Sequence, residues 1–365
     1  MEVTVSVPGK LFLAGEYAVT RGGPALVAAV SRRLHCRARA RSGQAAIALR
    51  SRACSFRMGP GAGEPEKAPR ELRFVAFAAR LATHALGLDD LELEIETESA
   101  LDDLGAEKTG LGGSAAATVA TVSAIWAVAG RDAVGDATLQ QRLAIALLAH
   151  RVAQGGGSGA DVVASTAGGV VAIEGLDSTA TPRSLSDAIL RLSQAPPVSF
   201  ERLELPAGLS LEAVGTGRAA ASGPRASRFA AACEGPERRL LDAWATGMRG
   251  AVEEFIAALR DGSSEATLRA CAGSGRWLER LAPLVPVPIC TPRLRLACAI
   301  ARRCGGVGRV SGAGGGDCAI ALVRDDRRME LRDAWRRAGL SPLEVYVDTG
   351  PRIEAQPGGS GDGRG

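Results

Sequence analysis

The chain has 365 residues, of which 46% are hydrophobic and 23% charged, the balance of a packed globular protein rather than a disordered one. Its formal net charge is only +4 and its charges are interspersed, which argues against a nucleic-acid-binding protein. No apolar run reaches about 18 residues, so no membrane span is predicted. The alternating N-terminus MEVTVSVPGK lacks the regions of a signal peptide, and we expect a cytoplasmic protein.

The first half of the chain predicts a mixture of strands and helices. Alternating or apolar runs predict strands at 3–7, 91–97 and 170–173. Apolar periodicity predicts helices at 70–86 and 114–129, and a third helix that Asp136 caps and that runs to Gln154. The Pro- and Gly-rich stretch 59–69 reads as a loop.

The second half predicts further strands and helices without strict alternation, which indicates an α+β fold. Helices are expected near 237–260, 264–282, 292–304 and 326–338. Strands are expected near 307–311, 318–323 and 344–348. Prolines 196 and 197 suggest a boundary between an N-terminal lobe, 1–195, and a C-terminal lobe, 196–353, followed by a flexible tail, 354–365.

A glycine-rich loop at 108–116, Lys-Thr-Gly-Leu-Gly-Gly-Ser-Ala-Ala, leads directly into the predicted helix at 114–129. Glycines let a backbone turn tightly and expose its N–H groups, and a helix N-terminus adds partial positive charge. The loop therefore suits a phosphate. It lacks the G-x-x-x-x-G-K-[ST] spacing of a Walker A loop, and by itself a plain glycine turn explains it equally well.

Two more glycine motifs accompany this loop: PGKLFLAGEYAV at 8–19 and SGAGGGDC at 311–318. In this order the three resemble the motifs of the GHMP kinase superfamily, and the resemblance extends from Val3 to about Val347. It implies an N-terminal lobe with a ribosomal-protein-S5-like fold and a C-terminal lobe with a ferredoxin-like fold. It also implies an ATP-dependent small-molecule kinase that holds ATP and Mg²⁺ between the lobes.

Within the superfamily, two stretches resemble the phosphomevalonate kinase group. Residues 149–164, AHRVAQGGGSGADVVA, are similar to its A-H-x-x-A-Q-G-x-x-G-S-G-x-D-V-A pattern, and TGRAAAS at 216–222 is similar to its T-G-x-x-A-S segment. The implied acceptor is 5-phosphomevalonate. Mevalonate kinase, another GHMP small-molecule kinase and a non-catalytic regulator of the same fold remain alternatives.

The resemblance also implies site residues. Lys10 and Asp161 would be catalytic, with Lys10 at the reacting phosphoryl group. Ser114 would hold the metal. ATP would contact Lys108, Gly110, Leu111, Gly112, Gly113, Ser114, Ala115 and Ala116. The acceptor would contact Glu16, Tyr17, Ser158, Gly159, Arg218, Ser222, Gly314 and Asp317.

The sequence departs from the family pattern at three positions. Gly113 replaces the first serine of the usual G-L-G-S-S-A. His150 stands where mevalonate kinase has a magnesium-binding glutamate, so metal coordination would rest on Ser114, ATP oxygens and water. Gly215 replaces a tryptophan that often precedes T-G. His150 shares a helix face with Leu139, Leu143 and Leu147, which favours a core histidine.

Charged residues refine these expectations. Only three of the 44 basic residues are lysines, at 10, 67 and 108, so a retained lysine suggests a need for a compact ammonium group. Asp161 is either a general base or a group that positions Lys10. A phosphate acceptor, with a second pKa of about 6, already carries charge at neutral pH, which favours the positioning role.

Five arginines are candidates to bind the acceptor phosphate: Arg21, Arg151, Arg218, Arg225 and Arg228. We expect a monomer or homodimer, with the eight cysteines as reduced thiols.

Overall fold

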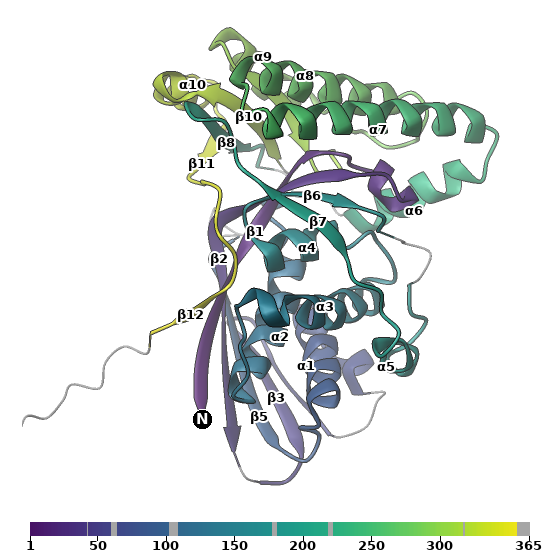
Figure 1. The fold of residues 1–365 in the computed structure, drawn as a ribbon, viewed down its shortest axis with the longest axis vertical. Coiled ribbons are helices and arrows are strands. Elements are labelled where there is room, and N and C mark those ends of the chain that lie inside the picture. The colour runs from purple at the N-terminus through teal and green to yellow at the C-terminus, as the bar shows by residue number, and fades with distance from the viewer. Residues whose placement is uncertain are drawn as a thin grey trace, which may run out of the picture.

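The computed structural model describes residues 1–41, 43–59, 64–101, 109–176, 181–217, 222–316 and 318–355, with the backbone alone at 222–224. It contains two sheets, one above the other in Figure 1, with helices packed against each. Within the described part of the chain, no helix is long and apolar enough to cross a membrane. The mixed α+β class predicted from the sequence is confirmed.

The first sheet has eight strands in the order β12-β1-β2-β5-β3-β4, with β6 beside β2 and β7 beside β6. All its neighbours are antiparallel except β3 and β5. Its strands are β1 (Glu2–Ala14), β2 (Ala25–Arg41), β3 (Ala46–Ser51), β4 (Ser55–Met58), β5 (Glu92–Ser99), β6 (Val170–Glu174), β7 (Ser199–Leu203) and β12 (Arg352–Glu354).

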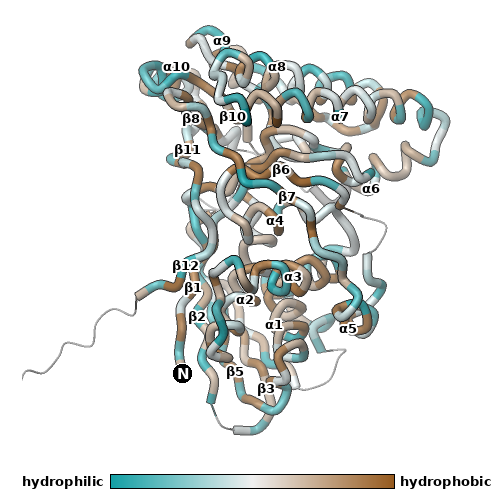
Figure 2. Tube along the Cα trace, in the orientation of Figure 1, coloured by the Kyte–Doolittle hydropathy of each residue, from teal (hydrophilic) through white to brown (hydrophobic). Residues whose placement is uncertain are grey.

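Helices cover one face of this sheet (Figure 1). They are α1 (Arg73–Leu86), α2 (Gly113–Val128), α3 (Leu139–Gln154), α4 (Ala160–Ala167) and α5 (Leu185–Leu192). The alanine-rich α2 lies at the centre, buried along most of its length between the sheet and the other helices, because small side chains allow close approach. Figure 2 shows hydrophobic residues gathered along α2, α3 and β6.

The second sheet has four antiparallel strands in the order β11-β8-β10-β9. They are β8 (Leu209–Gly215), β9 (Val307–Ser311), β10 (Cys318–Arg324) and β11 (Ser341–Leu343). The accompanying helices are α6 (Ser222–Cys233), α7 (Arg238–Arg260), α8 (Ser264–Leu281), α9 (Pro292–Arg303) and α10 (Arg328–Arg337). In Figure 1, α7 extends across the top of the molecule, with α6 below its far end.

Most predicted elements match to within a few residues, but two predictions were wrong. Asp136 does not cap a helix: it begins a 3-10 turn before α3, and its carboxylate pairs with Arg202 at 2.7 Å. The strand predicted at 344–348 is absent from the described structure, where Val347 forms a single bridge to Val30. Around this bridge the described segment makes only two backbone hydrogen bonds with β2, from Ser31 N–H to Tyr346 O and from Asp348 N–H to Ala29 O, each at 3.0 Å.

The division into two lobes at residue 195 stays a proposal, and the strand pairing shifts its boundary. β7 follows the two prolines but pairs with β6 in the first sheet. β12 includes Glu354, where the tail was expected to begin, and pairs with β1. The predicted tail lies outside the described residues from 356 onward. We therefore assign β7 and β12 to the first lobe.

Candidate active site

The first two glycine motifs lie against each other. Strand β1 carries Lys10, whose backbone N–H donates to Leu111 O at 2.8 Å and whose Nζ donates to Gly110 O at 3.0 Å. A Cβ at the neighbouring Gly9 would lie 2.7 Å from that same Leu111 oxygen, so only glycine allows this approach. Motifs that lie 100 residues apart in the sequence thus form one surface.

Gly112 lets the Lys10 side chain lie across the loop. It precedes α2 with a φ of +81°, a conformation that favours glycine. An ideal Cβ there would stand 2.8 Å from Lys10 Cε. The space beside Gly112 is therefore filled by the lysine, and not by an open phosphate cradle as the sequence suggested. The arrangement holds a largely buried ammonium beside the N-terminus of α2, where an anion is favoured.

Gly112→Val is therefore expected to abolish nucleotide binding by two routes. A β-branched residue is strained at this φ, and its side chain would displace Lys10. The measurement is an ATP titration of the folded variant, with Gly130→Val as the control. Gly130 also has a positive φ, of +71°, but a Cβ there meets nothing. Unchanged ATP affinity in Gly112→Val would contradict the loop's assignment.

The first turn of α2 contains the remaining loop residues. Gly113 and Ser114 are half-buried, whereas Ala115 and Ala116 are buried in the core. The Ala116 N–H donates to Gly112 O at 3.0 Å, so this donor is used inside the helix, and the contact of Ala116 with ATP stays a prediction. The predicted contact of Lys108 lies outside the described residues.

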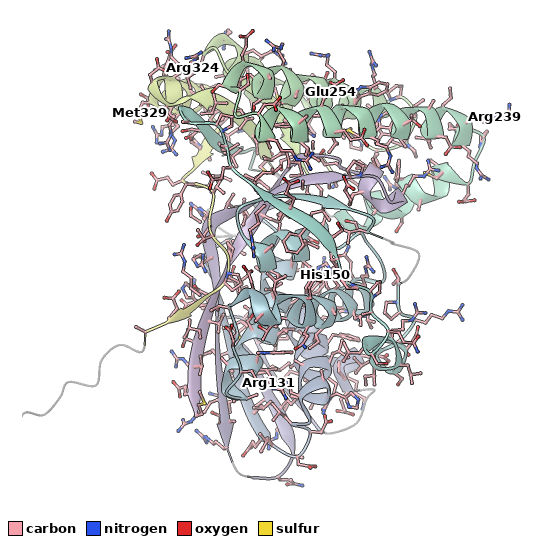
Figure 3. All side chains as sticks on the ribbon, in the orientation of Figure 1. Arg131, His150, Arg239, Glu254, Arg324 and Met329 are labelled. Carbon is pink, nitrogen blue, oxygen red and sulfur yellow. The ribbon has the colours of Figure 1, made fainter. Side chains whose placement is uncertain are left out.

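His150 on α3 is the polar neighbour of Ser114. Its Nε2 lies 3.3 Å from Ser114 Oγ, and its ring stacks on Phe74 with centroids 5.0 Å apart. Figure 3 labels His150 in the interior of the molecule. Burial lowers the pKa of His150, so the ring is neutral at pH 7. The predicted core position is confirmed, but the contact with Ser114 was not foreseen.

Asp161 lies in the first turn of α4, where its Oδ1 accepts from the Val162 N–H at 3.0 Å. It is half-buried, and its negative charge acts on His150. None of the ion pairs between described residues joins Asp161 to Lys10, whose ammonium donates to Gly110 instead. The hypothesis that Asp161 holds Lys10 through an ion pair thus finds no support in this structure.

The loop before α4 contains Ser158 and Gly159. Ser158 accepts from the Arg151 guanidinium at 2.9 Å through its carbonyl and from the Ala160 N–H at 3.3 Å through its hydroxyl. Gly159 is buried and precedes α4 with a φ of +80°. Arg151 therefore stabilises this loop, and its guanidinium is already engaged there.

The third glycine motif packs on the first. The Tyr17 hydroxyl donates to Ala313 O at 2.7 Å, and Ser311 Oγ donates to Phe12 O at 3.0 Å. Burial raises the pKa of Tyr17 to about 12, so this hydroxyl remains a donor. Gly314 is buried in the same turn. Tyr17 was predicted to contact the acceptor, but its hydroxyl joins the two motifs.

A buried ion pair reinforces this junction. Arg309 on β9 pairs with Glu16, and both side chains are at most 2% exposed. The same guanidinium donates to Leu13 O and, at 2.6 Å, to Ser274 Oγ. Glu16 was predicted to contact the acceptor, and in this structure its carboxylate is buried in the pair with Arg309. Nothing in the sequence singled out Arg309 among the chain's other arginines.

Among the candidate arginines that the structure describes, Arg225 on α6 lies against the third glycine motif. A Cβ on Gly315 would fall 2.2 Å from its guanidinium, and its charge lowers the pKa of Tyr17 against the larger effect of burial. Arg21 instead pairs with Asp242 at 2.5 Å, and Arg228 is exposed. Arg218 and Asp317 lie outside the described residues, as does the side chain of Ser222.

None of the eight cysteines forms a disulfide, and six are buried. Among the described residues, no group of three or more His, Cys, Asp or Glu side chains is arranged to hold a metal ion.

Comparison with known proteins identifies the family. The model for the GHMP kinase N-terminal domain matches residues 73–169, and the model for the C-terminal domain matches 255–340. A phosphomevalonate kinase from Streptomyces sp. (strain CL190) is 33% identical, over 93% of this chain and 95% of the relative. A mevalonate kinase from Aeropyrum pernix is 34% identical, over 46% of this chain and 49% of its own length.

Solved structures agree in fold. A Listeria innocua protein superposes with a TM-score of 0.85 at 25% identity, covering 98% of this chain and all of that one. The Streptococcus pneumoniae phosphomevalonate kinase, solved with phosphomevalonate and AMPPNP, gives a TM-score of 0.76 at 21% identity, covering 94% and 99%. The two family models and the Streptomyces relative show that the chain belongs to the GHMP kinase family.

Proposed function

We propose that this chain is a phosphomevalonate kinase, which transfers the γ-phosphoryl group of ATP to 5-phosphomevalonate and yields ADP and 5-diphosphomevalonate for isoprenoid synthesis. The observation that carries the proposal is the 33% identity with the Streptomyces phosphomevalonate kinase over almost the whole of both chains. The cytoplasmic location and the monomeric or dimeric state belong to the same proposal.

The geometry around Lys10 supports phosphoryl transfer. This reaction depends mainly on positioning and on neutralising negative charge. Lys10 supplies a compact cation whose stem is fixed by Gly112, and α2 directs the N–H groups of its first turn toward the same region. Both features suit the triphosphate of ATP better than an uncharged ligand.

A magnesium ion fits the oxygen groups that flank this region. Ser114 offers a half-buried hydroxyl and Asp161 a half-buried carboxylate, each in the first turn of its helix. Magnesium binds few protein oxygens and completes its shell with phosphate oxygens and water. We assign Ser114 to hold the ion, which when bound neutralises the phosphate charge. Ser114→Ala is accordingly expected to raise the magnesium concentration needed for turnover.

Asp161 is assigned a positioning role. Its carboxylate is fixed by the Val162 N–H and lies in the first turn of α4. Because the acceptor phosphate is already ionised near neutral pH, the reaction has less need of a general base than transfer to a hydroxyl. The negative charge of Asp161 instead orients the cations around the reacting groups.

Asp161→Asn is expected to lower kcat by about 10²-fold, the usual size of a single electrostatic contribution. The residual activity should still rise with ionisation of the acceptor phosphate, near pH 6. The measurement is kcat against pH for both proteins, with folding checked by circular dichroism. A variant whose activity no longer follows that ionisation would restore Asp161 as the base.

A panel of acceptors tests the proposal. ADP release is measured with 5-phosphomevalonate, mevalonate and homoserine in parallel. We expect turnover with 5-phosphomevalonate alone. Turnover with mevalonate alone would make the chain a mevalonate kinase, the alternative suggested by the partial match to the Aeropyrum pernix enzyme. No turnover with any acceptor would favour a non-catalytic regulator, against the retention of Lys10, Ser114 and Asp161.

A further inference from the structure

The Ser114 hydroxyl has a single hydrogen-bond partner in the part of the chain that the structure describes. This partner is His150 Nε2, 3.3 Å away on the neighbouring helix α3. A serine hydroxyl carries one proton and two lone pairs, and its partner decides which of them faces the ligand. His150 is thus placed to control what Ser114 can bind.

His150 is held firmly enough to serve this purpose. Its side chain is 2% exposed and stacks on Phe74 at an interplanar angle of 30°. A neutral imidazole has one donor nitrogen and one acceptor nitrogen. Nδ1 has no partner among the described residues, so whichever tautomer forms leaves that atom unpaired at comparable cost. The choice between tautomers therefore depends on the Nε2 contact with Ser114.

If Ser114 binds a metal ion, this determines which atom donates in its hydrogen bond with His150. A cation attracts the lone pairs of the hydroxyl and repels its proton, so the proton requires an acceptor on the far side. We propose that His150 Nε2 accepts a hydrogen bond from the Ser114 hydroxyl, which places the ring hydrogen on Nδ1 and leaves the serine lone pairs available to magnesium. His150 is then a positioning residue for the metal ligand. The inference rests on the proposed magnesium-dependent kinase function.

The tautomer can be measured directly, because the chain has only three histidines. The protein is labelled with ¹⁵N-histidine, and the ring nitrogens are observed by NMR without ligand and with magnesium and AMPPNP. The variants His35→Gln and His84→Gln assign the other two rings; His84 is an exposed residue beside Asp89. We expect His150 to carry its hydrogen on Nδ1 in both states. A hydrogen on Nε2 would overturn the proposal and make Ser114 the acceptor in this contact.

Two substitutions test the same contact through binding. His150→Phe keeps a ring on Phe74 but removes the acceptor, whereas His150→Gln keeps a carbonyl that reaches the position of Nε2. Calorimetry then measures the Kd of AMPPNP with magnesium and with EDTA. His150→Phe is expected to raise the Kd with magnesium roughly tenfold, to leave the metal-free Kd unchanged, and to be largely rescued in His150→Gln.

Equal weakening with and without magnesium would show that His150 supports the fold alone, and would overturn the proposal. In a Ser114→Ala background, His150→Phe should add little, because the coupled group is gone. If His150→Phe does not fold, the NMR measurement on the wild-type chain still decides. Neither measurement uses the acceptor, so a failed acceptor assay and a failed tautomer assignment are distinguishable.

Discussion

Lys10→Arg is expected to lower kcat by about 10²-fold or more, although the positive charge is kept. Lys10 is 9% exposed, its stem lies against Gly112, and its ammonium reaches Gly110 O at 3.0 Å. A guanidinium is larger than an ammonium and its donors are fixed in a plane, so it cannot occupy the same narrow position. The measurement is steady-state kcat with saturating ATP and 5-phosphomevalonate.

Lys67→Arg is the matched control. Lys67 is exposed in the 3-10 turn at 64–67 and pairs with Glu64 at 2.5 Å, a surface contact that an arginine can replace. It should leave kcat unchanged. If Lys10→Arg also kept the wild-type kcat, both the placement of Lys10 at the phosphoryl group and the argument from scarce lysines would be wrong.

Arg309→Ala is expected to lower the free energy of unfolding by about 3–5 kcal/mol. The substitution leaves the Glu16 carboxylate at 2% exposure without its cation, and it removes the donors to Leu13 and Ser274. Unpaired charges in such surroundings are costly because water cannot solvate them. Urea unfolding followed by circular dichroism measures the effect.

Two control variants test whether the loss of stability comes from the unpaired buried charge. Arg269→Ala removes an exposed pair with Glu265 and should cost less than about 1 kcal/mol. The double variant Glu16→Leu with Arg309→Met removes both charges together and should recover much of the lost stability. A loss in Arg309→Ala no larger than that in Arg269→Ala would contradict the structural role given to this ion pair.

Local rules made much of the fold predictable. The helices α7, α8 and α9 follow apolar periodicity between recognisable ends. Thr291, for example, caps the N-terminus of α9, and Pro292 is the first residue of that helix. The three glycine motifs were visible because tight turns and close approaches restrict the residue type. Gly9 and Gly112 illustrate this, since neither tolerates a Cβ.

The features that were not predicted depend mostly on contacts between residues that lie far apart in the sequence. Glu16 and Arg309 lie 293 positions apart, and nothing local marks either as the partner of the other. Ser114 and His150 meet because α2 and α3 pack together, a relation that helix periodicity alone does not fix. Strand β2 was missed although its sequence carries both signals of a strand, an apolar run at 25–30 and then alternation between buried and exposed residues.

Phosphorus NMR of the reaction product tests the central proposal most directly. The chain is incubated with ATP, magnesium and 5-phosphomevalonate, and the product is examined for a new phosphorus–oxygen–phosphorus linkage outside the nucleotide. We expect the acceptor's single phosphate signal to be replaced by the two coupled signals of a diphosphate, in step with ADP formation. An unchanged acceptor signal, together with a new phosphomonoester when mevalonate is supplied instead, would contradict the assignment of a phosphate-accepting kinase.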